Sequence, residues 1–517
     1  MSSPVPELPE SVEDPVRPEV IALAVAALVV GVVTRFVTRS ALWLDEALSV
    51  NIATLPLGDL RSALEHDGHP PLYYVLLHFW TDVFGTGAVA VRALSAVFGL
   101  LTICLVWFMG RRRGGSAMGW ILVAVVAVAP FAVRYSNEAR MYSLVMLLVA
   151  LGWFVLDDIV VRGRRSVLRF VALAALTAAL LYTHYWSMWL IAMLGLCALW
   201  GMWREPARRR IWGGVLASLI VGCVAFLPWV PTLLYQNAHT ATPWAEPSRP
   251  TVALSDSLVD FGSGRFGEKA LVAILLAVAL ILGLFGRAIS STKIELDLRT
   301  RPQVRRETIV AVGTFAIGSS VAFVTGSAFA SRYASVVFVP VMVIVAAGLT
   351  RFSGRWIRFG AVGVMVAALS VGAVMNITYE RSQSRVIGPA IAATAGPNDV
   401  VVVCPDQLGP GVNRVLPDGL RVVSYPDGGD GRFVDWVDYA VRNAASNPQA
   451  FADQVLAQAG PTGTVWLVWS VSYRTLESKC AELNAALSAA RPPRMLVAEN
   501  GDEWFEHASL TRFSPVP

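Results

Sequence analysis

The chain has 517 residues, of which 55% are hydrophobic and 15% are charged, and its formal net charge is +5. Soluble globular chains carry about 25% charged residues, so this chain has too little polar surface to face water throughout. Its basic residues lie in short runs between apolar segments and not on a separate soluble module, which argues against nucleic acid as a partner. The composition indicates an integral membrane protein.

Eleven segments are apolar enough, and close enough to the roughly 20 residues that a span needs, to be interpreted as membrane-spanning helices. They lie at 20–38, 89–109, 117–133, 141–160, 167–183, 186–203, 211–231, 269–287, 308–326, 334–350 and 359–377. No small-residue cleavage site follows the first segment, so we expect a retained helix and not a signal peptide. The sequence predicts a polytopic α-helical membrane protein with about 11 transmembrane helices over 20–379.

Arginine placement predicts the direction of these helices. Arginine runs fall in every second connection, at 111–113, 162–169, 204–210, 287–306 and 351–358. The positive-inside rule makes these connections cytoplasmic, so the tail at 1–19 is expected inside and the residues after 377 outside. The apolar segment 72–84 would be only about 20 Å long as a helix, and counting it as a span would invert every later loop. We expect a re-entrant or interfacial helix there.

The composition changes near residue 380 to that of a water-soluble domain. Residues 399–403 and 464–469 are predicted strands, 433–459 and 475–490 show helical periodicity, and 405–431 is expected to be loop. This alternation favours an extracytoplasmic α/β domain over 380–517. Cys404 and Cys480 fall within it, where a disulfide is permitted but not established by sequence. An acceptor-binding or partner-docking module and a cap without chemistry remain equally open.

The first outer connection carries an acidic pair, Asp45 and Glu46, soon after the first span. Carboxylates at a membrane boundary are costly to desolvate unless they have a partner or a function. Later in the same loop, two prolines follow His69 and hold its backbone extended above the interfacial helix. The structural alternatives are a helix N-cap for the acids and a simple turn for the histidine.

Three further outer connections carry candidate residues. The short segment 134–142 holds Glu138 and Arg140, and arginine there suits either a bound phosphate or an interfacial anchor. The aromatic residues at 182–186 are ordinary at an interface, whereas Arg332, between apolar helices, requires an anionic partner. Acids, histidines and arginines from four distant loops thus lie on one side of the membrane, which suits a phosphate-linked lipid.

Two motifs resemble the GT-C-type glycosyltransferases, nearest to the branch of protein O-mannosyltransferases and the lipid A aminoarabinose transferase. These motifs are Trp43-Leu44-Asp45-Glu46-Ala47 and His69-Pro70-Pro71-Leu72-Tyr73-Tyr74, supported by the segment 137–142 and by Arg332-Tyr333. The resemblance covers about residues 20–377 and leaves the C-terminal domain unmatched. It implies transfer of a sugar, with inversion, from a polyprenyl phosphate carrier to an acceptor outside the cytoplasm of a bacterium.

The resemblance also implies residue roles. Asp45 matches the first-loop acid proposed as general base, and Glu138 matches the second-loop acid that assists or binds metal in some members, so a divalent cation is left open. With these two, Glu46 completes the expected catalytic set. The expected substrate-binding residues are His69, Tyr73, Arg140, Tyr142, His184, Tyr185, Arg332 and Tyr333. Because phosphate is already a good leaving group, the protein must supply mainly positive charge and a base.

The expected partners are a polyprenyl-phosphate sugar donor, membrane lipids, and a glycan, glycolipid or protein acceptor. Mannose is the first expectation for the sugar and arabinofuranose the second. One alternative is a transporter or flippase of a lipid-linked sugar, but transporters place polar residues near the bilayer midplane, often in paired repeats. A second alternative is a membrane scaffold whose soluble domain does the work.

Overall fold

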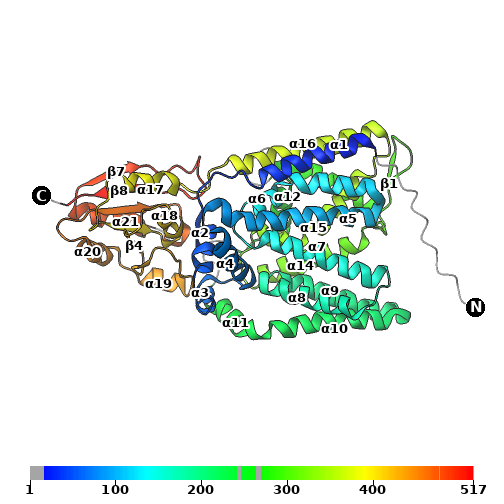
Figure 1. Cartoon of the computed structure of the whole chain (residues 1–517), viewed down its shortest axis with the longest axis horizontal. Helices are drawn as coiled ribbons and strands as arrows, with labels where there is room; N and C mark the ends of the chain where they lie inside the picture. The colour runs from blue at the N-terminus through cyan, green and yellow to red at the C-terminus, as the bar shows by residue number, and fades with distance from the viewer. Residues whose placement is uncertain (1–16, 241–245, 264–268, 477, 516–517) are drawn as a thin grey trace, which may run out of the picture.

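The structure is a computed structural model that describes residues 17–240, 246–263, 269–476 and 478–515. It is elongated, with a helical bundle at one end and a sheet-containing domain at the other (Figure 1). The segment 1–19, expected to be a cytoplasmic tail, lies almost wholly outside the described residues.

The bundle consists of apolar helices that run along the molecule. They are α1 (Pro18–Thr34), α5 (Ala88–Val128), α6 (Pro130–Ser136), α7 (Tyr142–Leu156), α8 (Val167–Thr183), α9 (Ser187–Arg204), α10 (Arg209–Phe226), α13 (Lys269–Phe285), α14 (Arg305–Val324), α15 (Ser335–Leu349) and α16 (Arg355–Thr378). Within the described ranges, seven helical stretches are long and apolar enough to span a membrane, and α1, α8 and α13 are shorter apolar helices. Every predicted span lies largely in helix, so the predicted polytopic α-helical fold is confirmed.

Helix α5 supplies two of the predicted spans. It is broken at Gly114 and Gly115, and Gly115 has a φ of 75°, in the left-handed region that favours glycine. A Cβ on Gly110 would lie 2.8 Å from the Cα of Gly119, so glycine permits the two halves to fold back closely on one another. The break therefore separates the predicted spans 89–109 and 117–133.

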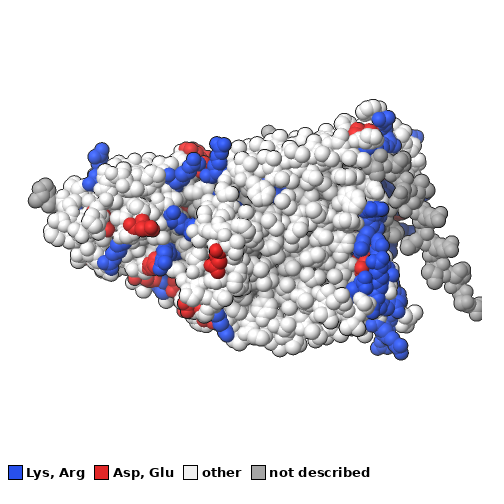
Figure 2. Space-filling view, viewed as in Figure 1, with Lys and Arg blue, Asp and Glu red and all other residues white. Residues whose placement is uncertain are grey.

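The two ends of the bundle differ in charge. Figure 2 shows Lys and Arg gathered at the end remote from the sheet domain, with few charges on the flank between. At that end, Arg113 donates hydrogen bonds to Glu307 at 2.7 Å and to Asp157 at 2.9 Å, and Trp153 donates to Glu307 at 2.8 Å. These contacts join α5, α7 with its π-helical extension η1 (Asp157–Val161), and α14.

Short helices lie at the other end, between the bundle and the sheet domain. They are α2 (Leu44–Ala53), α3 (Leu60–Asp67), α4 (Leu72–Phe84) and α11 (Val230–His239). Helix α12 (Pro250–Gly262) packs against α6, α13 and α14 within the bundle. The 3-10 turns of the bundle sequence are η2 (Pro206–Arg208), η3 (Leu227–Trp229) and η4 (Ser331–Ala334). Helix α4 corresponds to the predicted short helix at 72–84, and it packs against α2 and α5. Helices α11 and α12 were not predicted.

The C-terminal domain contains a six-stranded sheet of order β5-β4-β3-β6-β8-β7. Its strands are β3 (Val400–Cys404), β4 (Arg421–Ser424), β5 (Gly429–Asp430), β6 (Val465–Trp469), β7 (Pro493–Val497) and β8 (Ser509–Phe513). Strands β4, β3 and β6 are parallel, with Val402 opposite Val423 and Leu467, and the outer strands are antiparallel. Burial on both faces explains why β3 and β6 are continuous apolar runs.

Helices complete this domain. They are α17 (Ser384–Ala392), α18 (Gly409–Asn413), α19 (Tyr439–Ala445), α20 (Pro448–Ala459) and α21 (Lys479–Ala490), with turns η5 (Asp406–Leu408) and η6 (Arg474–Leu476). A separate two-stranded ribbon, β1 (Gly286–Ala288) with β2 (Ile294–Leu296), lies at the opposite end of the molecule (Figure 1).

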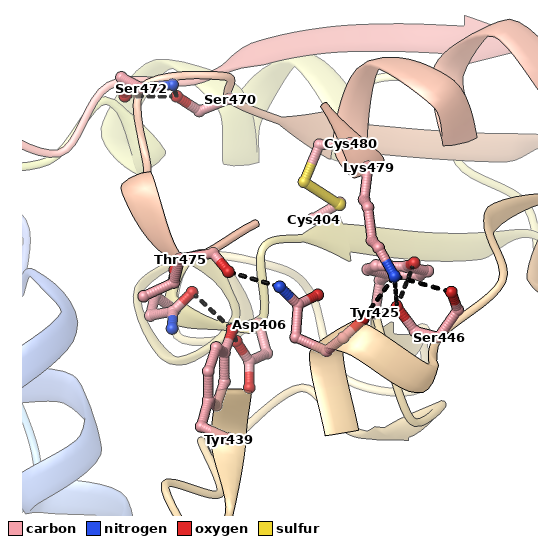
Figure 3. Close-up of a disulfide and its surroundings, with 12 residues drawn as sticks. Cys404, Asp406, Tyr425, Tyr439, Ser446, Ser470, Ser472, Thr475, Lys479 and Cys480 are labelled. Carbon is pink, nitrogen blue, oxygen red and sulfur yellow. Dashed lines mark hydrogen bonds between the residues drawn. A yellow bond between two sulfur atoms is a disulfide. The ribbon is translucent and has the colours of Figure 1, made fainter. Parts of the chain in front are cut away.

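The structure corrects two expectations for this domain. The segment 405–431 is not all loop, because it contains α18 and strand β4, whose four residues begin with an exposed arginine and so carry little pattern. The helical segment 433–459 is divided, because Asn447 caps α20 by accepting hydrogen bonds from the backbone of Gln449 and Ala450. Cys404 and Cys480 form a disulfide that joins β3 to α21 (Figure 3).

Candidate active site

The acidic pair lies in the first turn of α2, where the helix dipole favours negative charge. The two carboxylates have different surroundings. The Asp45 side chain is 17% exposed, whereas that of Glu46 is fully buried. Of the two, Asp45 is therefore the acid that a substrate can reach.

Asp45 lies beside two arginines from distant loops. Its Oδ2 accepts a hydrogen bond from Arg332 Nη1 at 3.2 Å and lies 3.9 Å from Arg140 Nε. The Nη1 of Arg140 donates to Ser49 at 3.0 Å and to Tyr74 at 3.3 Å, which fixes this guanidinium. Arg140 Nε has no hydrogen-bond acceptor among the described residues, so it remains available to an anion.

His69 extends this cluster from the connection between α3 and α4. Its Nε2 lies 2.9 Å from Arg140 Nη2, and its Nδ1 lies 2.9 Å from Asp67 Oδ2. Because a guanidinium can only donate, Nε2 accepts, and Nδ1 carries the proton that it donates to Asp67. Burial would raise the pKa of Asp67, but His69, Arg140 and a hydrogen bond from Tyr74 outweigh it and lower that pKa to about 2. Asp67 is thus an anion that orients His69.

An aromatic wall faces the charged cluster. The ring centroid of His184 lies 5.6 Å from that of Tyr142 and 5.4 Å from that of Tyr333. His184 Nδ1 accepts the backbone N–H of Trp186 at 3.1 Å, and burial, aided by the charges of Arg140 and Arg332, holds the pKa of His184 well below its usual value. His184 is therefore neutral. The Tyr142 hydroxyl is buried without a hydrogen-bond partner among the described residues.

A second layer of charges lies behind Asp45. Glu46 accepts hydrogen bonds from Arg92 at 2.7 and 2.6 Å and from the backbone N–H of Ala139 at 3.1 Å. Glu138 pairs with Arg134 at 3.2 Å and with Arg381 at 3.3 Å. These ion pairs hold the first-loop and second-loop acids in a fixed frame.

The ion pairs of Glu46 and Glu138 also bear on whether the site could hold a divalent cation, a question that the sequence left open. Across the parts of the chain that the structure describes, no three His, Cys, Asp or Glu side chains converge in a way that could hold a metal ion. The carboxylates of Glu46 and Glu138 are ion-paired with Arg92, Arg134 and Arg381, and a cation would be repelled by those arginines. These two acids are therefore poor ligands for a divalent cation.

The structure brings seven of the eleven predicted site residues to one place: Asp45, His69, Arg140, Tyr142, His184, Arg332 and Tyr333. Glu46 and Glu138 lie in the layer behind. Tyr73 is fully buried, and its hydroxyl lies 2.9 Å from Ser95 Oγ. Tyr185 donates to Gln236 and accepts from Trp229 at 3.0 Å. The structure therefore places neither tyrosine against the Asp45 cluster.

Sequence reasoning missed three residues of this region. Asp67 stands two residues before His69, close enough to orient it, but the short motif gave it no special weight. Arg92 lies inside a predicted span, where an ionisable residue usually has a partner, so a signal was available. Arg381 follows the last span, and nothing in its local sequence indicates the contacts with Glu46 and Glu138.

An apolar cavity of about 870 Å³ lies in the bundle among α7, α8, α9, α10, α14 and α15. Leu180 and Leu190 line its part nearest the candidate site, and Leu180 stands one helical turn before His184. Trp153 and Glu307 line its other part, toward the arginine-rich end. The cavity thus runs along the apolar bundle to the arginine-rich end, and no residue of the Asp45 cluster lines it.

Comparisons with known proteins bear on the fold of the chain. A family model described as dolichyl-phosphate-mannose-protein mannosyltransferase matches residues 68–235. Crystal structures of ArnT from Cupriavidus metallidurans, in the apo state and bound to undecaprenyl phosphate, superpose on the chain with TM-scores of 0.61 and 0.57. In both, 95% of this chain and 97% of the other are covered, at 14% sequence identity.

The chain has the GT-C fold. The resemblance carried by the motifs at 43–47 and 69–74 is therefore confirmed for the fold. The matched family model includes His69, Glu138, Arg140 and His184 but neither Asp45 nor Arg332. No curated protein sequence matches the chain.

Proposed function

We propose that the protein is a glycosyltransferase that moves a sugar from a polyprenyl-phosphate carrier to an acceptor at the extracytoplasmic face of the membrane. The observation that carries this proposal is the position of Asp45 beside Arg140 and Arg332, at the end of an apolar helical bundle. A substrate with a phosphate head and an isoprenoid tail suits a charged site at the edge of an apolar bundle. The mannosyltransferase family model and the ArnT complex with undecaprenyl phosphate support the same substrate class.

The two arginines bind the donor phosphate in this proposal. Guanidinium groups remain charged and match phosphate oxygens with paired N–H donors. Their charge stabilises the negative charge that grows on the phosphate as its bond to the sugar breaks. Phosphate therefore departs without needing a strong proton donor.

Donor binding also prepares the base. Without donor, Asp45 is the anion that accepts from Arg332. A bound phosphate replaces Asp45 as the counter-ion of the arginines, so the Asp45 carboxylate loses its hydrogen bond from Arg332. Because that hydrogen bond lowers the basicity of the carboxylate, its loss makes Asp45 a stronger base. Asp45 then takes the proton of the acceptor hydroxyl while the acceptor oxygen attacks the anomeric carbon opposite the phosphate, which leaves with the bonding electrons. This in-line displacement inverts the anomeric centre.

The polar groups around Asp45 suit a sugar. Tyr142 supplies a buried hydroxyl without a partner among the described residues, and His69 is held in one orientation by Asp67. Mannose is our first candidate, because the matching family model describes mannosyltransferases, and arabinofuranose is the second. The acceptor is a glycolipid, a polysaccharide or a protein of the cell envelope.

The charge distribution supports the orientation. The positive-inside rule directs the arginine-rich end toward the cytoplasm, which puts Asp45 and the C-terminal domain outside. The disulfide between Cys404 and Cys480 fits an oxidising compartment. The ionisable cluster lies at one end of the bundle and not at its middle, which disfavours a transporter.

The test uses the full chain in lipid nanodiscs, supplied with radiolabelled polyprenyl-phosphate mannose and an envelope extract as acceptor. We expect label in the extract and release of polyprenyl phosphate from the wild-type protein but not from Asp45→Asn. Polyprenyl-phosphate arabinose is the second donor to be supplied. Movement of labelled lipid between leaflets without transfer to any acceptor would instead identify a flippase.

A further inference from the structure

The N-terminus of α2 has no side-chain hydrogen-bond acceptor at its N-cap position. Trp43 stands at the N-cap position and offers no side-chain acceptor, although the first N–H groups of a helix need partners. The N–H of Leu44 instead donates to Glu506 Oε2 at 2.7 Å. Glu506 belongs to the C-terminal domain, so the two residues are 462 positions apart.

Glu506 is held firmly in this position. It is only 4% exposed, and its Oε1 accepts a hydrogen bond from Ser382 Oγ at 2.7 Å. Its backbone N–H donates to Arg381 O at 2.8 Å, and its backbone oxygen accepts from Gln383 at 2.9 Å. The carboxyl group therefore cannot turn away from α2 without breaking several contacts.

A second contact acts on the same turn. The ring of Phe505 meets the ring of Trp43 edge to face, with centroids 5.3 Å apart. Two consecutive residues of the C-terminal domain thus contact Trp43 and Leu44, and the next residue along α2 is Asp45. These contacts hold the helical turn that carries Asp45.

We infer that Glu506 is a positioning residue: the C-terminal domain uses its carboxyl group to cap α2 and thereby to direct Asp45 at the substrate. The chemical part of this inference rests on the proposed glycosyltransferase function, whereas the cap does not. It gives the C-terminal domain a part in completing the active site.

The surroundings of Glu506 favour the neutral form of its carboxyl group. Burial raises its pKa to about 8, assisted by the negative charges of Asp45 and Glu46 and opposed by the hydrogen bonds from Leu44 and Ser382. A neutral carboxyl and a carboxamide present the same carbonyl acceptor. Glutamine is therefore a close replacement at this position, and alanine is not.

The experiment compares Glu506→Gln and Glu506→Ala with Glu503→Ala, a change of an exposed glutamate in the same loop. Hydrogen–deuterium exchange measures the cap at the amides of residues 44–47, and the nanodisc assay measures kcat and the donor KM. We expect Glu506→Ala to speed exchange of these amides about fivefold. We expect its kcat to fall about 10- to 100-fold while the donor KM stays within about twofold, because the base is misplaced and the phosphate site is intact. Glu506→Gln and Glu503→Ala should match the wild type.

Several results would overturn the inference. Wild-type exchange and kcat in Glu506→Ala would show that no cap is needed, and a loss of kcat in Glu506→Gln equal to that in Glu506→Ala would refute a neutral cap. Should Glu506→Ala not fold, Ser382→Ala keeps the carboxyl but releases Oε1. Faster exchange at residues 44–47 and a lower kcat would then support the inference, and no change in either would refute it. Altered exchange in a protein whose wild type transfers no sugar would retain the cap and reject the proposed function.

Discussion

The Asp45 carboxylate accepts a hydrogen bond of 3.2 Å from Arg332, although 287 residues separate the two in the sequence. One residue comes from α2 and the other from η4, and both lie at the end of the bundle that adjoins the C-terminal domain. Substitutions of these two residues should have different effects. Changes to Asp45 should affect the chemical step, and changes to Arg332 should affect donor binding.

Asp45→Asn should abolish transfer while leaving donor binding in place. The amide keeps the size of the side chain but cannot take a proton, so kcat should fall by about 10²–10⁴-fold. Radiolabel transfer measures kcat, and a filter assay with labelled polyprenyl phosphate measures binding. The matched control is Asp59→Asn, at an exposed position of the same loop. Full transfer by the Asp45 variant would refute its role as base.

Arg332→Lys and Arg140→Lys should weaken donor binding. A lysine keeps the charge but loses the paired N–H donors, so the Kd for polyprenyl phosphate should rise about tenfold in each variant. The comparison is Arg39→Lys, a change of an exposed arginine. An unchanged Kd in both site variants would place the phosphate elsewhere.

Glu46→Gln should lower stability and not only activity. Glu46 is fully buried and neutralises Arg92, so its loss leaves a buried guanidinium without its partner, at a cost of about 3–5 kcal/mol. Thermal unfolding in detergent measures the change. Glu65→Gln breaks a part-exposed pair with Arg61 and should cost less than about 1 kcal/mol. A Glu46 variant as stable as the wild type would show that this pair contributes nothing to the fold.

Glu506 makes stability depend on pH in a defined direction. Its folded-state pKa of about 8 lies above that of an unfolded glutamate, so between about pH 4.5 and 8 the unfolded chain binds fewer protons than the folded one. Stability therefore falls as pH rises through this window. Glu506→Gln removes the effect, so its stability advantage over wild type should grow from pH 4.5 to 8 and then level off. Equal pH profiles for the two proteins would contradict the raised pKa.

The disulfide should stabilise the C-terminal domain. It joins residues 76 positions apart, and removing a native disulfide from a small domain typically costs about 2–5 kcal/mol. Cys404→Ser should therefore lower the unfolding temperature of the domain, whereas Cys104→Ser, at a free cysteine, should not. Mass spectrometry of alkylated peptides measures the bond directly, and free thiols at both positions in the isolated protein would refute it.

Much of the architecture follows from apolar segment length. The bundle helices were predictable because each carries a long apolar run, and α4 was separated from them because residues 72–84 are too few to span. Helices α11 and α12 were not predictable in the same way, since they lie in a polar connection. Strand β4 has four residues and β5 has two, too few for alternation to be distinguished from loop.

The candidate site also contains residues that the sequence predicted and residues that it did not. Asp45, His69 and Arg140 stand in dense local motifs, and hydropathy together with arginine placement put them on one face. The partners that fix them are dispersed: Arg92 lies within a span, and Arg381 and Glu506 lie beyond the last one. Their contacts join residues hundreds of positions apart, and no local pattern records such a pairing.

The hydrogen bond from Leu44 to Glu506 has a consequence for biogenesis. The ribosome makes α2 early, yet the group that caps it emerges more than 450 residues later. A nascent chain with every bundle helix in place still lacks the acceptor for the Leu44 N–H, so the first turn of α2 is completed only when the C-terminal domain has been made and has folded.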